Sequence, residues 1–268
     1  MDKQHGLQTE VTGFAGDAAL QQAMAAGSVD VGLASSTASA TAAVKGSTIK
    51  IVAQIDDSPK FMTIIGASGV NSVDDLKGKQ VGVTSHGAFT EYVLLRLNQA
   101  KGWGDNGIQP VALGGLDQQV AALKTKQDSG FVWTVDGGLQ MEQQSLGKII
   151  WHADEIMPDL PFEVVIAQNK LISDNPTLIK NYVAALFDAI KFMKANKDQA
   201  VQLFSKDMQV PADIAGKVYD GDISAMSDSG AISPKGMQNL AQAITETKAV
   251  PSAPDPKTFY DSQFAGTK

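Results

Sequence analysis

The alternation of short apolar segments with helix-like segments near the start of the chain constrains the fold most strongly. Residues 11–14 are β-rich, and residues 18–26 consist mainly of good helix formers. Asp17 stands before that helix as a candidate N-cap, and Gly27 follows it where helices commonly end. Residues 29–34 are strand-like again, with alternating apolar side chains.

The pattern continues as far as residue 55. Residues 37–44 predict a second helix that closes at Gly46, and residues 49–55 (IKIVAQI) predict another strand. A strand, a helix and a strand at this spacing indicate βαβ units, whose strands normally lie parallel in one sheet. The chain is therefore expected to be an α/β protein.

A similar pattern returns in the middle of the chain. Asp30-Val31-Gly32-Leu33 is echoed by Asp128-Ser129-Gly130-Phe131, and each stretch follows a helix-like segment. Either an internal repeat or two βαβ units of the same architecture would give this similarity. In both cases the sequence predicts two similar α/β lobes. The other expected elements are strands at 61–65, 80–84 and 162–167, a short helix at 72–78 capped by Ser72, a long helix opened by 85–90, a helix starting at Asn175-Pro176, and helices near 198–206, 211–219 and 234–247.

Composition excludes several classes of function. The 268 residues are enough for two domains of ordinary size or one large domain, and a composition of 43% hydrophobic and 19% charged residues predicts a buried core. The net charge of −7 argues against nucleic acid or an anionic membrane as partner. There is no cysteine, so disulfides, thiolate metal sites and cysteine nucleophiles are excluded. No stretch approaches the ~20 apolar residues of a membrane helix, and the first residues do not form a signal peptide.

No strong catalytic motif is present. The sequence lacks G-x-S-x-G, a P-loop, H-E-x-x-H and the dinucleotide fingerprint, and its three histidines have no metal-like spacing. Adjacent acids, as at Asp56-Asp57 and Asp74-Asp75, are more typical of turns and caps than of an acid/base pair. We therefore expect no catalytic residue, no metal site and no cofactor, and an enzyme is the weaker hypothesis.

Two strands end in small hydrogen-bonding residues just before a helix. Ser35-Ser36-Thr37 does so in the first expected lobe, and Ser85-His86-Gly87 does so in the second. Ligands of open α/β sheets sit beyond the carboxyl ends of strands, where helix N-termini and hydroxyls can hold an oxyanion. Each corner alone could be a simple N-cap, but two facing corners would form a cleft. Trp133, near Asp136, could stack on a ligand or simply pack in the core.

The order of these segments resembles a family of transport proteins. The stretches GDAALQQAMAAGSVDVGLASSTASATAAVKGSTIKIVAQI, SVDDLKGKQVGVTSHGAFTEYVLLRLNQAKGW, VALGGLDQQVAALKTKQDSGFVWT and LPFEVVIAQNKLISDNPTLIKNYVAALFDAIKFMKAN carry the similarity. Together they resemble the nitrate/sulfonate/taurine-type substrate-binding proteins of ABC transporters, a group that includes binders of thiamine-pyrimidine precursors. The resemblance covers nearly the whole chain.

This resemblance implies a type II periplasmic-binding-protein fold, with two α/β lobes joined by two crossover strands that close around a small molecule. Lobe 1 would comprise residues 1–66 and 164–268, and lobe 2 residues 67–163. The ligand-binding residues implied by position, including the two corners, are Ser35, Ser36, Thr37, Gln54, Asp56, Asp57, Ser85, His86, Gly87, Phe89, Thr90, Trp133, Asp136, Phe162 and Glu163.

The resemblance also implies a function and a location. The chain would capture a small organic molecule or an oxyanion (a sulfonate, nitrate, an aromatic or a pyrimidine-like compound) and deliver it to an ABC permease, in the periplasm or another extracytoplasmic space. Enzymes on the same bilobal fold remain the alternative, although the cysteine-rich motif of the thiamine-pyrimidine enzymes is absent. A transcription regulator would need a helix-turn-helix, and the sequence has no basic helical segment for one.

Two departures from the family pattern affect these expectations. Family members have a further strand and helix before the segment matching residues 3–11, so we expect a weakened site, a rearranged segment or a second chain at that sheet edge, and otherwise a monomer. Arg96 is the only arginine and lies inside the helix after the second corner. Because oxyanion binders often use a bidentate arginine, its position and the acids of the expected site favour a neutral or cationic heterocycle or an aromatic compound.

Overall fold

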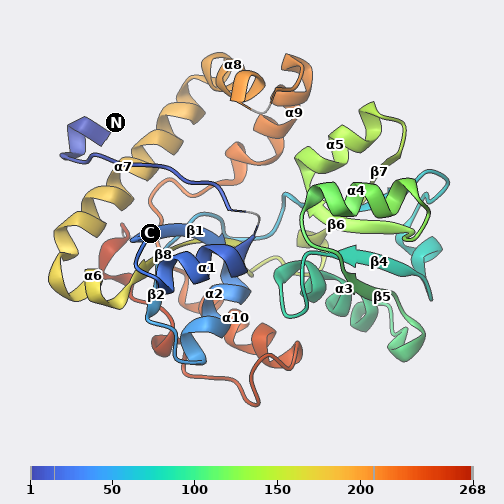
Figure 1. The fold of residues 1–268 in the computed structure, drawn as a ribbon, viewed down its shortest axis with the longest axis horizontal. Coiled ribbons are helices and arrows are strands. Elements are labelled where there is room, and N and C mark those ends of the chain that lie inside the picture. Colours follow the sequence, from blue (N-terminus) through green and yellow to red (C-terminus); the bar gives the residue numbers. More distant parts are fainter. Residues whose placement is uncertain (1, 15, 208, 267–268) are drawn as a thin grey trace.

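The strands form two separate sheets that stand side by side, each with helices packed around it (Figure 1). The computed structural model describes residues 2–14, 16–207 and 209–266. A three-stranded sheet and its helices form lobe 1, and a five-stranded sheet and its helices form lobe 2. The expected class of two α/β lobes is confirmed.

The sheet of lobe 1 has the order β1-β8-β2, made from β1 (Val31–Ser35), β8 (Glu163–Gln168) and β2 (Ile49–Gln54). β8 is antiparallel to both neighbours. β1 and β2 therefore run parallel to each other in one sheet, as predicted, but the sheet is not parallel throughout because the antiparallel β8 lies between them. The helix α2 (Ser36–Val44) joins β1 to β2 as a βαβ unit, but β8 enters between the two strands from much later in the chain.

The sheet of lobe 2 has the order β5-β4-β6-β3-β7. β4 pairs in parallel with β5 and β6, whereas β3 is antiparallel to β6 and β7. β3 thus lies in the sheet of lobe 2, although the expected boundary assigns residues up to 66 to lobe 1. The strands are β3 (Met62–Ala67), β4 (Gln80–Val83), β5 (Gln109–Ala112), β6 (Gly130–Thr134) and β7 (Gly147–His152).

The internal similarity of the sequence corresponds to repeated architecture. In lobe 1, α1 (Asp17–Ala25) leads to β1 and α2, and in lobe 2, α4 (Leu116–Lys124) leads to β6 and α5 (Val135–Gln143). The other helices are α3 (Phe89–Ala100), α6 (Asn169–Asp174), α7 (Pro176–Ala195), α8 (Lys197–Asp207), α9 (Ala212–Gly221) and α10 (Pro234–Glu246).

Helix ends follow the predicted signals in most places. Asn175 accepts a hydrogen bond from the backbone N–H of Leu178 as the cap of α7, and Ser72 forms a capping box with Asp75. Asp17 is different, because Gly16 is the N-cap and Asp17 lies inside α1. Residues 11–14 do not form the predicted strand, and Val11 is 91% exposed, because this segment pairs with no sheet.

The largest apolar cluster joins the two lobes. It includes Val83 and Phe89 from lobe 2 together with Ala40, Val164 and Leu240 from lobe 1. A second bridging cluster lies between α5 and α9, where Val135 and Leu139 pack with Ile214 and Val218. The lobes therefore meet over packed side chains on two sides. None of the described helices is long and apolar enough to cross a membrane.

Candidate functional site

Two chain segments cross between the lobes, and Asp56 binds them to each other. Asp56 lies in the first crossing, which joins β2 to β3, and is fully buried. Its carboxylate accepts hydrogen bonds from the backbone N–H groups of Phe162 (2.8 Å) and Glu163 (2.7 Å), at the end of the second crossing. Burial raises the pKa of Asp56 well above its usual value, although these two hydrogen bonds oppose the shift. Asp56 therefore ties the two crossings together by hydrogen bonds.

The hydroxyl groups at the corner of lobe 1 also form hydrogen bonds within the fold. Ser35 donates from its backbone N–H (2.9 Å) and its Oγ (2.6 Å) to the two carboxylate oxygens of Asp17. Ser36 donates from its N–H to Phe162 O (2.7 Å) and from its Oγ to Pro161 O (2.6 Å), so it holds the second crossing. Both serines are buried. Their hydroxyls hence position Asp17 and the crossing.

Two other expected residues near this corner are buried, and one is exposed. Thr37 is 1% exposed, and its Oγ1 has no hydrogen-bond partner among the described residues. Gln54 accepts from Ser233 N–H (3.0 Å) and donates to Asp57 (2.7 Å), which ties β2 to the segment before α10. Asp57 is exposed.

The corner of lobe 2 is more exposed to solvent than the corner of lobe 1. Ser85 and His86 are exposed, and His86 Nδ1 lies 2.6 Å from an oxygen of Glu91. The other oxygen of Glu91 accepts from the N–H of Gly87, which has φ +79° and adopts a turn that favours glycine. Thr90 is buried, and its Oγ1 accepts from the N–H of Thr84.

Aromatic rings gather at the end of the second crossing. Phe162 is half-buried and makes edge contacts with Phe61 (5.3 Å between ring centroids) and Phe89 (4.8 Å). Trp133 instead packs with the apolar cluster under α4 and α5, and its ring lies against Gly137. This contact supports core packing for Trp133 and leaves Phe162 as the aromatic residue of the junction.

Two pairs of acids lie near the junction of the lobes. Asp17 and Glu163 flank Ser35 in lobe 1, and Asp136 and Asp222 lie on α5 and at the end of α9, which pack together; we call these four the junction carboxyls. Burial, and then the charge of Asp17, raise the pKa of Glu163 to about 7. Burial, followed by the charges of Asp136 and Glu163, raises the pKa of Asp222 to about 7 as well. Like charges and desolvation both favour the protonated form, so two of these groups titrate near neutral pH.

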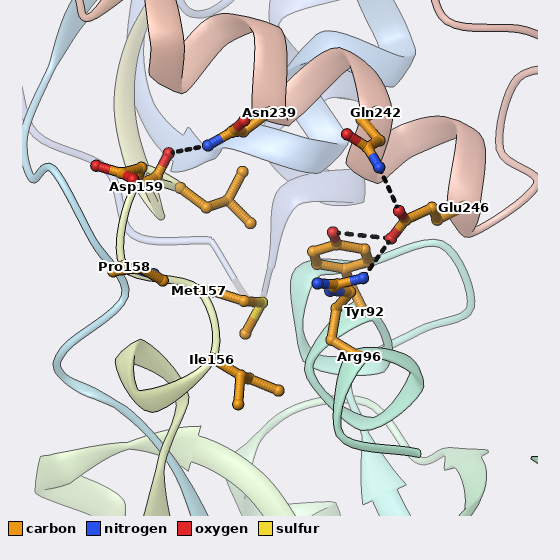
Figure 2. A pocket seen from close by; sticks show the side chains of 10 residues that line it. Tyr92, Arg96, Ile156, Met157, Pro158, Asp159, Asn239, Gln242 and Glu246 are labelled. Atoms are coloured by element: carbon orange, nitrogen blue, oxygen red, sulfur yellow. Dashed lines mark hydrogen bonds and ion pairs between the residues drawn. The ribbon is translucent and has the colours of Figure 1, made fainter. Parts of the chain in front are cut away.

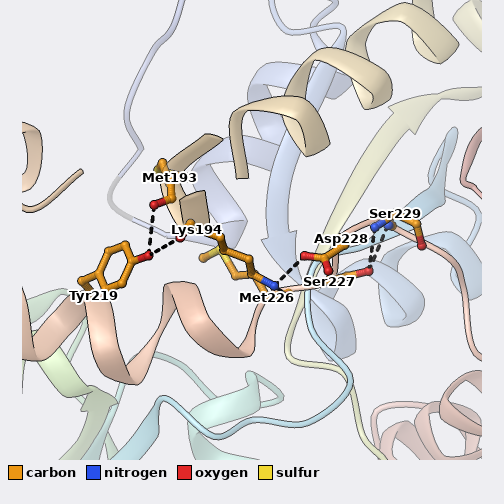
Figure 3. A network of polar contacts seen from close by, with 8 residues as sticks. Met193, Lys194, Tyr219, Met226, Ser227, Asp228 and Ser229 are labelled. Carbon is orange, nitrogen blue, oxygen red and sulfur yellow. Dashed lines mark hydrogen bonds and ion pairs between the residues drawn. The ribbon is translucent and has the colours of Figure 1, made fainter. Parts of the chain in front are cut away.

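Two of the junction carboxyls were predicted from the sequence as site residues, and two were not. Asp136 and Glu163 were expected, but Asp17 was interpreted as a helix cap and Asp222 was not singled out. Asp222 lies at the end of α9, which a polar network holds in place (Figure 3). Tyr219 donates to the carbonyls of Met193 (3.0 Å) and Lys194 (3.2 Å), and Lys194 also binds Asp228 (2.7 Å). No local sequence signal brings α9 to this position.

A pocket of about 160 Å³ lies between α3 of lobe 2, α10 of lobe 1 and the second crossing. Figure 2 shows Tyr92 and Arg96 beside Glu246, opposite Ile156 and Met157. Glu246 accepts hydrogen bonds from Tyr92 (3.2 Å) and Arg96 (3.3 Å). The only arginine of the chain is therefore used in a contact between the lobes. Within the described residues, no group of three or more His, Asp or Glu side chains could hold a metal ion.

Two α/β lobes joined by two crossings define a protein of the periplasmic-binding fold. Solved structures share this fold. The ligand-binding component of an ABC-type import system from Staphylococcus aureus, with zinc bound, has a TM-score of 0.80 and 17% identity, covering 96% of this chain and 87% of that one. The periplasmic aliphatic sulphonate binding protein SsuA of Escherichia coli has a TM-score of 0.77 and 19% identity, covering 93% and 81%.

The sequence also assigns the chain to a protein family. The chain belongs to the NMT1/THI5-like family, whose model matches residues 3–200. A Brucella abortus protein whose name describes a binding protein is 25% identical over 277 residues, covering 99% of this chain and 84% of that protein. The suspected family resemblance is thereby confirmed.

Proposed function

We propose that this protein is the solute-binding component of an ABC importer, which captures a small molecule between its lobes and delivers it to a membrane permease outside the cytoplasm. The observation that carries the proposal is the junction itself, where residues of both lobes and both crossings meet around Phe162 and Glu163. Family membership and the relatives described as binding proteins support it. The protein acts by binding and not by catalysis.

The proposed site lies between the corners and not inside them. Its walls are Phe162, the junction carboxyls and the exposed residues Ser85 and His86, while Ser36, Gln54 and Asp56 support it from behind. The chain passes from one lobe to the other between residues 54 and 62 and again between residues 152 and 163, because these segments join the two sheets.

Calorimetry with a panel of solutes tests the function. An alkanesulfonate, an aminopyrimidine and an alkylamine would be titrated into the protein, and each compound would be recovered afterwards and compared with the starting material by NMR. We expect saturable one-to-one binding of one chemical class, with the compound returned unchanged. Chemical conversion of the bound compound would instead establish the enzyme alternative, and failure of all three classes to bind would contradict solute capture.

A matched pair of phenylalanine variants locates the site. Phe162→Ala should weaken binding of the active compound at least tenfold, because it removes the aromatic surface at the junction. Phe192→Ala changes a residue of α7 that is 37% exposed and should leave affinity unchanged. Equal affinities in the two variants would exclude the junction as the site.

A further inference from the structure

We propose that the pocket between α3, α10 and the second crossing is a second binding site, which takes a small neutral carboxamide with an apolar body. The pocket lies apart from the proposed solute site, because Phe162, Glu163, Ser85 and His86 are not among the residues that line it. The inference therefore stands or falls independently of solute capture at the junction.

The pocket has room for a small organic molecule. Its volume is about 160 Å³, and an apolar cavity of about 150 Å³ in another protein is large enough to bind benzene. Its walls come from α3 of lobe 2, from α10 of lobe 1 and from residues 156–160 of the second crossing. A compound in the pocket would therefore contact both lobes and the crossing at once.

One wall of the pocket is apolar. Ile156, Met157, Pro158 and Leu160 line it from the second crossing. Figure 2 shows Ile156 and Met157 opposite the side chains of α3, with the pocket between them. Met157 and Leu160 are buried, and Ile156 is half-buried. Because burial of apolar surface drives binding, we expect the ligand to place an apolar body against this wall.

The charged groups of the pocket wall already have partners. Arg96 Nη1 donates to Glu246 across the lobes (3.3 Å), and Asp159 forms an ion pair with Lys235 (2.5 Å). A charged ligand would have to displace one of these partners or enter without a countercharge, which is unfavourable in a partly enclosed site. A neutral ligand avoids both costs.

On the lobe 2 side, the guanidinium of Arg96 keeps donors that the fold does not use. Nη1 donates to Gln99 (2.7 Å) and to Glu246. Neither Nη2 nor Nε forms a hydrogen bond with a described residue, and Nε is buried. Since buried donors in folded proteins are nearly always paired, the unpartnered Nε is an independent indication that an acceptor is missing here. A carbonyl oxygen beside the guanidinium would supply one.

On the lobe 1 side, two amide side chains of α10 keep free acceptors. The amide nitrogen of Asn239 donates to the carbonyl of Asp159 (2.9 Å), and that of Gln242 donates to Glu246 (2.9 Å). Their side-chain oxygens have no hydrogen-bond partner in the part of the chain that the structure describes. A carboxamide carries one acceptor for Arg96 and an NH₂ group for these oxygens, so it matches both sides of the pocket.

Three probes of nearly the same shape and different charge test the ligand class. Benzamide, benzoate and benzamidinium would each be added at 10 mM to the full chain at pH 7.5, and the unfolding temperature measured. We expect benzamide to raise the unfolding temperature by about 2–4 °C, which corresponds to a dissociation constant of about 1 mM. The two ions should shift it by less than half as much. No shift with benzamide, or an equal shift with either ion, would overturn the inference.

A matched pair of isoleucine variants connects the effect to the pocket. Ile156→Ala removes part of the apolar wall and should weaken benzamide binding at least about fivefold. Ile172→Ala removes the same side-chain atoms from α6, where Ile172 packs on a different apolar cluster, and should leave the affinity unchanged. Circular dichroism would establish that both variants are folded. Equal benzamide affinities in the two variants would contradict the assignment.

A lysine substitution tests the contact with the guanidinium. Arg96→Lys keeps a positive charge near Glu246 but removes the planar set of donors, and it should weaken benzamide binding at least about fivefold. An unchanged affinity would contradict recognition of a carbonyl group by Arg96.

Hydrogen exchange separates this pocket from the junction. With 10 mM benzamide, the backbone amides of residues 156–160 and of the last turns of α3 and α10 should exchange at least about threefold more slowly, because the ligand contacts all three segments. The amides of residues 35–37 and 162–163 should exchange as before. Protection confined to the latter residues would place benzamide at the junction and overturn the second site.

Discussion

At the level of single residues, the serine hydroxyls before α2 form hydrogen bonds within the fold. The sequence pattern predicted that Ser35 and Ser36 face a cleft, and in the structure their hydroxyls donate to Asp17 and to the carbonyl of Pro161. The pattern correctly indicated an important corner, because these bonds place Asp17 and the second crossing at the junction. It could not indicate the partners, which come from distant parts of the chain.

Trp133 allows a direct test of packing against ligand contact. Trp133→Ala should lower the free energy of unfolding by about 2–4 kcal/mol, because the ring packs with the apolar cluster under α4 and α5. Affinity for the solute should change less than threefold in the folded variant. Urea unfolding and calorimetry would measure the two effects. Lost affinity with unchanged stability would instead show that Trp133 contacts the solute.

At the level of elements, local signals predicted most helices and strands but not their neighbours. The caps at Ser72 and Asn175 and the strands around residues 31 and 49 follow from short-range patterns. The insertion of β8 between β1 and β2 does not, because strand order depends on contacts between residues more than 100 positions apart. Asp222 was missed for the same reason, since only tertiary packing brings the end of α9 to the junction.

Replacing two helical glycines by alanine should change stability in opposite directions. A Cβ at Gly138 of α5 would lie 2.3 Å from Cγ1 of Ile149 on β7, whereas a Cβ at Gly216 of α9 would meet nothing within 4 Å. Gly138→Ala should therefore destabilise the protein by about 1–3 kcal/mol despite the better helix propensity of alanine. Gly216→Ala should stabilise it by up to about 1 kcal/mol. Chemical denaturation of both variants would measure the changes, and equal shifts would contradict close packing of α5.

At the level of the whole molecule, the two lobes touch on both sides of the crossings. The apolar contact between α5 and α9 lies on one side, and the bonds of Glu246 to Tyr92 and Arg96 lie between α10 and α3. These contacts join the two lobes outside the proposed site. Opening of the lobes would have to break these contacts, although they lie outside the proposed site.

Removing the polar contact should shift that balance. Spin labels would be attached at Lys45→Cys and Lys124→Cys, two exposed positions in different lobes of a chain without native cysteine. We expect Glu246→Gln to increase the mean distance between the labels and to broaden its distribution. Pulsed electron resonance would measure the distance. Solute affinity should fall by up to about fivefold, in line with the ~1 kcal/mol of a favourable surface ion pair.

The control for this experiment is an ion pair that stays within one helix. Asp174→Asn removes the partner of Lys170 in α6 and should leave the label distance unchanged. The same distance distribution in Glu246→Gln and Asp174→Asn would show that the contact of Glu246 does not hold the lobes together.

The central position of β8 determines the order in which the protein can fold during synthesis. The strands of lobe 2 come from one continuous stretch, residues 62–152, so their sheet can form as soon as that stretch has left the ribosome. β1 and β2 emerge earlier but must wait for residues 163–168, which pair with both. Until then their backbone groups are free to pair with other chains. Slower synthesis between residues 55 and 162 would prolong this period, during which a chaperone that covers exposed strands would protect lobe 1.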